Sequence, residues 1–387
     1  MTTSPDTLAD AVQADGNLPP AWASSLRSVD RARFIPDRAW LDTEAGVVPI
    51  DRGTDPDGWA EAVYSDRVLL TQFDDGSTTW PRIGHRPTSS SSMPSSMLGM
   101  LDALDAQRGH RVLEIGAGTG YNAALIAAQI GPAGQVVTVE VDPALAGRAH
   151  RRLAGRALVV TGDGGDGYAE TAPYDRVIAT ATAQLGKLPY AWVQQCRPGA
   201  VIIAPVRTDL TSGPLVRYRV DENGTALGKV APQRVGFMEL RTHRCPLPDL
   251  DDLRWDDPCA EQAITAMSPV DPIHDEGARW TVGVRVPSCR WRFWKRGEHG
   301  LKHGVVWFVD PVTGSWTTVA PGNSSGANIV RQFGPRRLWD EVESAYRWWQ
   351  EHGCPALERW RFEVTATEQR ILLEGADPIP NTICPWE

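Results

Sequence analysis

One glycine-dense turn constrains the fold of this chain more than any other stretch. Residues 110–131 read HRVLEIGAGTGYNAALIAAQIG: a short apolar strand at 112–115, three glycines at alternate positions, and an Ala/Leu-rich helix that ends at Gly131. Glycines let the backbone turn sharply and let a ligand approach closely, and the helix N-terminus offers free N–H groups to an anion. A purely structural turn needs one or two glycines, so the three predict a strand-turn-helix unit that binds a ligand.

The segments on either side of this turn alternate between helix and strand. Residues 97–105, MLGMLDALD, have the apolar spacing of a helix, and QVVTVEVD at 135–142 is the next expected strand. Farther along, buried parallel strands are expected at 172–182 and 198–206, with a helix at 188–197 between them. This alternation predicts the α/β class with a doubly wound sheet.

A second domain is expected because 387 residues are long for one domain. Eleven of the sixteen tryptophans follow residue 250, and the acidic stretch PLPDLDDLRWDDP at 246–258 lies before nearly all of them. We therefore predict an α/β domain over 1–245, an acidic linker region over 246–279 and a Trp-rich α+β domain over 280–387.

Five strands and one helix are expected in the second domain. The expected strands lie at 280–286, 290–295, 304–310, 316–321 and 360–367, and the helix begins at or just after Pro335. Within CRWRFWKRGEHGLKH (289–303), aromatic residues alternate with Arg290, Arg292, Lys295, Arg296 and Lys302. This stretch is either an amphipathic hairpin with its tryptophans in the core or a surface that grips an acidic peptide.

Charge and cysteine use exclude several classes of protein. A net charge of −9 disfavours nucleic-acid binding, which relies on Lys and Arg meeting phosphate. The six cysteines are scattered without a CxxC pair or zinc-finger spacing, so free thiols are expected and no metal site.

No apolar run approaches the roughly 18 residues of a membrane span, and the N-terminus lacks a signal peptide's features, so a cytoplasmic protein is expected.

The order of residues in the glycine turn distinguishes two nucleotide ligands. A dinucleotide site reads G-x-G-x-x-G, whereas this turn reads E-x-G-x-G-x-G through Glu114, Gly116, Gly118 and Gly120. The Glu-led order resembles motif I of class I S-adenosylmethionine-dependent methyltransferases and disfavours an NAD enzyme. The resemblance implies a Rossmann-like methyltransferase fold with S-adenosylmethionine as cofactor.

This resemblance assigns further positions to the cofactor. Glu140, at the end of the next strand, would accept hydrogen bonds from both ribose hydroxyls, which suits an acceptor-only carboxylate. In GDGGDGY at 162–168, Asp163 and Gly164 would lie beside the adenine amine. A plain surface turn is the alternative interpretation of that segment.

Several segments together resemble one methyltransferase family, the protein L-isoaspartyl O-methyltransferases. They are RFIPDRAW, VYSD, TSSSSMP, RVLEIGAGTGYNAALIA, GDGGDGY, APYDRVIATA, RPGAVIIAPV and VGFMEL, in this order between about residues 15 and 245. The last, at 235–240, resembles the closing strand of the family's domain. The combination is more specific than any single motif.

The serine run RPTSSSSMPSSM, residues 86–97, is a flexible linker if judged by composition alone. In the family that the chain resembles, this segment is a wall over the cofactor's methyl group, and its hydroxyl and backbone groups hold the substrate carboxylate. Aligning Pro94 with the family's proline implies Ser92 as the matching serine, with Ser90 and Ser91 upstream. These three serines are the predicted catalytic-site residues.

A carboxylate acceptor also suits such a site on chemical grounds. A carboxyl group with a pKa near about 4 is ionised at neutral pH, so methyl transfer to it needs no general base. Catalysis then consists of holding the oxygen in line with the methyl carbon where water is excluded.

The long chain with a Trp-rich tail resembles, more narrowly, the methyltransferases associated with ATP-grasp peptide maturases. That resemblance implies methylation of an aspartate in a ribosomally made, crosslinked precursor peptide (a graspetide), followed by aspartimide and isoaspartate formation. It also implies the precursor, and an ATP-grasp ligase, as partners. The second domain would grip the precursor, so deleting residues 250–387 is expected to abolish modification while leaving cofactor binding.

Three alternatives remain open on the sequence. The first is a repair enzyme that methylates isoaspartyl sites in aged proteins, and the second is a methyltransferase for a small carboxylate. The third is a binding module that has lost catalysis, although Glu114, the glycines, Glu140, Asp163 and Ser92 occur together.

Overall fold

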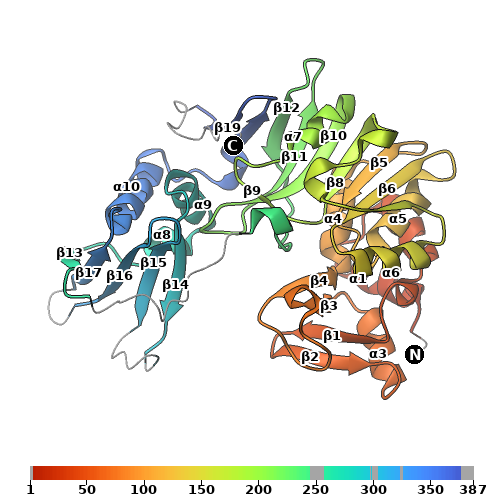
Figure 1. The fold of residues 1–387 in the computed structure, drawn as a ribbon, viewed down its shortest axis with the longest axis horizontal. Helices are drawn as coiled ribbons and strands as arrows, with labels where there is room; N and C mark the ends of the chain where they lie inside the picture. Colours follow the sequence, from red (N-terminus) through yellow and green to blue (C-terminus); the bar gives the residue numbers. More distant parts are fainter. Residues whose placement is uncertain (1–2, 245–256, 297, 299–303, 323–325, 376–387) are drawn as a thin grey trace.

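The computed structural model describes residues 3–244, 257–296, 298, 304–322 and 326–375. These residues form a four-stranded sheet near the N-terminus, a ten-stranded central sheet and a five-stranded sheet near the C-terminus. The N-terminal and C-terminal sheets lie on different sides of the central sheet (Figure 1).

The central sheet has the strand order β19-β18-β12-β11-β10-β8-β5-β6-β7, with the short β9 paired to β10. Neighbouring strands from β7 to β10 are parallel, and those from β10 to β19 are antiparallel. The strands are β5 (Arg111–Ile115), β6 (Gln135–Glu140), β7 (Leu158–Thr161), β8 (Tyr174–Ala179), β9 (Ala183–Gln184), β10 (Cys196–Arg207), β11 (Leu215–Val220), β12 (Ala226–Val230), β18 (Trp360–Val364) and β19 (Gln369–Leu373).

Helices cover both faces of the parallel part, as a doubly wound sheet requires. The helices are α1 (Pro5–Ala14), α2 (Ala23–Ser28), α4 (Pro94–Leu104), α5 (Tyr121–Ile130), α6 (Pro143–Leu153) and α7 (Tyr190–Gln194). One apolar cluster joins one face to α1, α2, α4, α5 and α6, and a second joins the other face to α7. The predicted α/β class with a doubly wound sheet is confirmed for this part of the chain.

The N-terminal sheet has the order β2-β1-β3-β4 and is antiparallel throughout. Its strands are β1 (Arg38–Thr43), β2 (Gly46–Asp51), β3 (Leu69–Phe73) and β4 (Pro87–Ser91), and α3 (Pro56–Val63) packs against it. The serine run supplies β4 and then the first turn of α4, so it is a paired strand and a helix start, not a linker.

The C-terminal sheet has the order β13-β17-β16-β15-β14. Its strands are β13 (Glu261–Thr265), β14 (Arg290–Trp294), β15 (Val305–Asp310), β16 (Ser315–Pro321) and β17 (Asn328–Phe333), and its helices are α8 (Asp271–His274), α9 (Glu276–Arg285) and α10 (Leu338–Glu351). An apolar cluster joins the sheet to these helices. The predicted strands at 290–295, 304–310 and 316–321 and the helix after Pro335 are present.

The strand predicted at 280–286 is wrong, because these residues belong mostly to helix α9. Asp275 caps this helix by accepting hydrogen bonds from the N–H groups of Gly277 and Ala278. Trp280 and Val284 pack into the core of the central sheet, while Val282 packs into the core of the C-terminal sheet. Burial on two sides produces the alternating apolar pattern that resembled a strand.

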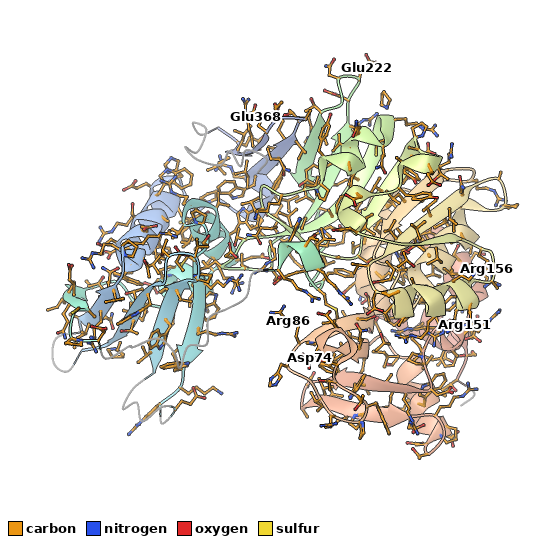
Figure 2. All side chains as sticks on the ribbon, viewed as in Figure 1. Asp74, Arg86, Arg151, Arg156, Glu222 and Glu368 are labelled. Atoms are coloured by element: carbon orange, nitrogen blue, oxygen red, sulfur yellow. The ribbon has the colours of Figure 1, made fainter. Side chains whose placement is uncertain are left out.

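The last two described strands belong to the central sheet. The predicted strand at 360–367 is present as β18, which pairs with β12 and with the unpredicted β19. Glu222 and Glu368 mark the turns after β11 and after β18, which lie on the same side of the molecule (Figure 2). Residues from the predicted 280–387 domain thus complete the sheet of the predicted 1–245 domain.

Two other predicted features differ from the structure. VGFMEL at 235–240 is not a strand, and its only sheet-like contact is a single bridge between Thr182 and Glu239. The acidic stretch at 246–258 lies mostly outside the described residues.

Candidate active site

A cavity of about 540 Å³ lies at the carboxyl ends of β5 and β6, where open α/β sheets bind ligands. Most of its lining comes from the serine run, the glycine turn, residues 139–141, residues 163–164 and residues 236–241 with Arg244. Every lining residue comes from between Asp42 and Arg244, so the described C-terminal sheet adds none.

The glycine turn forms the floor of this cavity. Gly116, Gly118 and Gly120 have φ of +95°, +51° and +87°, the left-handed region that favours glycine. A Cβ at Gly116 would lie 2.8 Å from Thr180 Oγ1, so that glycine also permits close packing against β8's end. The glycine N–H groups bond within the protein, Gly118 to Glu140 Oε2 at 2.8 Å.

The turn still offers donors to a ligand. Ala117 and Thr119 line the cavity, and their N–H groups donate no hydrogen bond to any described residue. The side-chain oxygen of Asn122 is buried and also lacks a partner in the described parts of the chain. These unpaired polar atoms show that the turn is built to bind a polar ligand.

Glu114 lies beneath the turn and does not line the cavity. Its fully buried carboxylate accepts hydrogen bonds from Asn122 Nδ2 at 2.6 Å and from Thr138 Oγ1 at 2.5 Å. Burial raises the pKa of Glu114 to about 7. The residue ties the start of α5 to β6, and it forces the Asn122 amide to present its oxygen elsewhere.

Glu140 does line the cavity, at the end of β6. Its Oε2 accepts from Gly118 N–H, and its Oε1 accepts from Asp142 N–H at 3.1 Å. Burial raises the pKa of Glu140, while these N–H groups oppose the rise. Each carboxylate oxygen retains a lone pair for a ligand hydroxyl.

Asp163 and Gly164 line the same cavity. Asp163 Oδ1 accepts from Gly165 N–H at 2.8 Å, and Gly164 O accepts from Trp192 Nε1 at 2.7 Å. The structure thus brings Gly116, Gly118, Glu140, Asp163 and Gly164 together around the cavity, whereas Glu114 and Gly120 lie behind it.

The serine run also lines the cavity and comes close to the glycine turn, since a Cβ at Gly118 would lie 3.4 Å from Ser90 O. Ser89, Ser90, Ser91 and Ser92 all line the cavity. The hydroxyls of Ser90 and Ser92 have no hydrogen-bond partner among the described residues, whereas Ser89 Oγ accepts from Thr71 Oγ1 at 2.9 Å. Ser91 is buried, and its Oγ accepts from Arg31 Nη2 at 3.2 Å. Two of the three predicted serines therefore have free hydroxyls.

Two lining residues that the sequence did not single out, Arg241 and Arg244, form ion pairs with acidic residues next to the cavity. Arg241 Nη2 lies 3.3 Å from Asp142 Oδ2, and Arg241 Nε lies 3.1 Å from Asp75 Oδ1. Arg244 Nη1 lies 2.8 Å from Asp75 Oδ2, and Gln72 Nε2 donates to Asp142 Oδ2 at 2.8 Å. No sequence signal marks these pairs, because their members are far apart in the chain.

The chemistry of the lining narrows what the cavity can do. No lysine, histidine or cysteine lines it in the part of the chain that the structure describes. Among the same residues no group of three or more His, Cys, Asp and Glu could hold a metal ion. None of the described helices combines the length and apolarity needed to cross a bilayer. The lining supplies hydrogen-bond donors and acceptors, and no lysine, histidine or cysteine that could act as a general base beside its serines.

Comparisons with known proteins agree on one family. A family model described as protein-L-isoaspartate(D-aspartate) O-methyltransferase (PCMT) matches residues 6–243. A protein-L-isoaspartate O-methyltransferase of Ignicoccus hospitalis is 37% identical over 155 residues, covering 38% of this chain and 71% of the relative. One of Methanopyrus kandleri is 41% identical over 120 residues, covering 30% of this chain and about half, 52%, of the relative.

A solved structure named protein-L-isoaspartate O-methyltransferase shares the fold. It matches with a TM-score of 0.52 at 19% identity. The match covers 95% of this chain and 99% of the solved one, so the likeness of fold extends beyond residue 243.

Proposed function

We propose that this chain, which belongs to the protein-L-isoaspartate(D-aspartate) O-methyltransferase family, methylates the side-chain carboxylate of an aspartyl-type residue in a peptide. Its central sheet is the class I S-adenosylmethionine-dependent methyltransferase fold. S-adenosylmethionine is the methyl donor of this family and supplies an electrophilic methyl group. The family and the fold thus indicate methyl transfer from S-adenosylmethionine, and the residues that line the cavity suit a carboxylate as the methyl acceptor.

The cavity fits the cofactor on its own residues. Glu140 would take the ribose hydroxyls, and Asp163 with Gly164 would take the adenine amine. The unpaired N–H groups of Ala117 and Thr119 are available to a zwitterionic amino-acid group. Acceptors and donors are both present, as such a ligand requires.

The single observation that carries the proposal is the pair of free hydroxyls on Ser90 and Ser92. A carboxylate is an acceptor-only anion, and hydroxyl donors orient it without removing its charge. The acceptor is already ionised at neutral pH, so the lack of a histidine or lysine in the described lining is no obstacle. These serines hold the oxygen in position, which is the contribution that catalysis needs here.

For the substrate, we propose an aspartate in a crosslinked precursor peptide. The family model does not match the residues beyond 243, so these residues can serve a further function, which here is recognition of the precursor peptide. Arg292, Lys295 and Arg296 are exposed on β14 and just after it, where they could meet an acidic peptide. Arg290 is not available, because it is buried and lies 3.3 Å from Asp209. Lys302 is outside the described residues.

The second candidate is methylation of an isoaspartyl residue. It is favoured by the family description and by the printed names of the relatives. Both candidates use the same cavity, so the choice depends on how the peptide backbone approaches the serines.

One experiment separates the candidates. Full-length protein and S-adenosylmethionine are incubated with four peptides of one acidic sequence: crosslinked with a free Asp-Gly, linear with Asp-Gly, linear with isoAsp-Gly, and crosslinked with Asn-Gly. Mass spectrometry reports a methyl ester as the gain of one methylene and an aspartimide as the net loss of one water. We expect the crosslinked Asp-Gly peptide to turn over fastest and the Asn peptide not at all.

Fastest turnover of the isoAsp peptide would favour the repair function instead. If the protein binds S-adenosylmethionine in calorimetry but methylates none of the peptides, a peptide carboxylate is the wrong acceptor.

A further inference from the structure

Arg31 is a buried cation that forms no ion pair within the described residues, although the Asp66 carboxylate attracts it from farther away. Its side chain is 0% exposed, and none of the described ion pairs includes it. It donates instead to five carbonyl oxygens, at distances of 3.0 to 3.3 Å; these belong to Val63, Ser65, Arg67, Ser91 and Ser92. The Tyr121 ring lies 5.9 Å from the guanidinium carbon. Such a charge is costly to bury, so a stabilising role alone accounts poorly for it.

The contacts of Arg31 with the serine run have a geometric consequence. Arg31 Nη2 lies 3.3 Å from Ser91 O and 3.0 Å from Ser92 O, so two consecutive carbonyls point at one guanidinium. The peptide bonds that follow them are trans, and in a trans peptide the N–H points opposite to the C=O. The N–H groups of Ser92 and Met93 therefore point away from Arg31.

Those two N–H groups have no hydrogen-bond acceptor among the described residues. Both residues line the cavity, and the free hydroxyl of Ser92 lies in the same segment. A second anchor holds the segment from the other end, because Asp66 Oδ1 accepts from Ser95 N–H at 2.8 Å. The result is a short, fixed stretch of backbone with its donors unpaired.

We propose that Arg31 is the positioning residue for the acceptor carboxylate, holding the Ser91 and Ser92 carbonyls so that the N–H groups of Ser92 and Met93 meet the anion. This inference rests on the proposed carboxylate methylation. Arg31 touches neither the substrate nor the cofactor and acts through the two peptide groups.

Charge adds to this alignment. A hydrogen bond to a carbonyl polarises its peptide group and strengthens donation by the N–H on the other side. A cation behind the wall also attracts an anion in front of it, and little water intervenes to screen the attraction. Arginine suits the position because its fork reaches several oxygens in fixed geometry, which a lysine ammonium cannot match.

The test compares Arg31→Met and Arg31→Lys with wild type, and Arg52→Met serves as a matched control. Arg52 also belongs to the N-terminal region, but it stacks on Trp59, its side chain is exposed, and it does not line the cavity. For each protein, calorimetry gives the affinity for S-adenosylmethionine, and initial rates give kcat and KM for whichever peptide carboxylate wild type methylates. Inhibition by the Asn counterpart of that peptide then gives the preference for carboxylate over carboxamide.

We expect Arg31→Met to lower kcat/KM by roughly 10- to 100-fold and the carboxylate preference by about 10-fold, with cofactor affinity within about 3-fold of wild type. Arg31→Lys should recover the carboxylate preference but only part of kcat/KM, because lysine restores the positive charge without the planar guanidinium that reaches several oxygens. Arg52→Met should match wild type in every measurement.

The proposal is overturned if Arg31→Met loses activity but keeps the wild-type preference, since Arg31 would then only stabilise the fold. It is also overturned if Arg31→Lys is fully active, and this holds even if Arg31→Met fails to fold. Failure of the underlying function looks different, because wild type itself would then methylate none of the peptide carboxylates.

Discussion

The N-terminal and C-terminal regions join the central domain in opposite ways. The N-terminal sheet is held by buried polar contacts, chiefly those of Arg31, Asp66 and Gln72, and it supplies much of the cavity wall. The C-terminal region is joined by apolar packing, through Trp280 and Trp360, and by the pairing of β18 with β12, and it supplies no described lining residue. Directional contacts fix atoms near the reaction, whereas apolar area mainly adds stability.

This difference changes what truncation can show. Trp280, Trp360 and Phe362 share one apolar cluster with Leu113 and Ile115 of β5, the strand that leads into the glycine turn. Deleting residues 250–387 would therefore expose the core of the cofactor-binding sheet as well as remove a recognition unit. Point substitutions test the comparison more cleanly than the deletion that the sequence suggested.

The largest expected effect is on stability, at the C-terminal side of the comparison. Trp360→Ala should destabilise the whole fold by about 3–5 kcal/mol and weaken cofactor retention on heating. Trp339→Ala, in the separate core of the C-terminal sheet, should leave cofactor binding intact. Urea unfolding followed with and without S-adenosylmethionine compares the two. Equal loss of cofactor binding in both variants would contradict the distinction.

The next largest effect is on turnover, at the N-terminal side. Ser92→Ala should lower kcat/KM for the peptide by roughly 10- to 100-fold while cofactor affinity changes little, because one donor to the carboxylate is lost. Ser95→Ala is the control, since its side chain does not line the cavity and its N–H remains. Steady-state rates together with calorimetry measure both quantities. Full activity of Ser92→Ala would remove this serine from the acceptor site.

Glu114, beneath the glycine turn, should make the stability of the protein depend on pH. Its pKa in the fold is about 7, above its ordinary 4.5, because burial disfavours the charged form. Such a group contributes stability that is fully present below pH 4.5 and is lost as the pH rises through about 7. Relative to Glu114→Gln, wild type should therefore lose roughly 1–3 kcal/mol between pH 4.5 and pH 8. Urea midpoints across this range measure it, and parallel profiles would contradict the assignment.

The smallest expected effect concerns peptide capture by the C-terminal sheet. Changing Arg292, Lys295 and Arg296 to Gln should raise KM for an acidic peptide about 2- to 5-fold at low salt, and less at high salt. Changing Arg148, Arg151 and Arg156 of the α6 region to Gln removes the same charge elsewhere; Figure 2 shows Arg151 and Arg156 well away from the C-terminal sheet. If both triple variants shift KM equally, net charge rather than the basic strand is responsible.

Much of the fold and part of the site could be predicted from local patterns. The strand, glycine turn and helix at 110–131 follow from periodicity and from the left-handed angles that the turn requires. The same pattern did not reveal that Glu114 lies under the turn, because burial depends on Thr138 and Asn122 closing over it. Helix α9 was missed for a similar reason, since two cores on opposite sides bury its residues.

The sequence by itself determined the class of sheet and the glycine turn, because these depend on backbone stereochemistry within a few residues. It placed the serines only through the resemblance to a known family. Only the tertiary structure decided that Arg31, sixty residues before Ser91, stands behind the serines, and that β18 completes the sheet beside β12. Such pairings depend on which distant segments exclude water together. No local pattern in the chain records them.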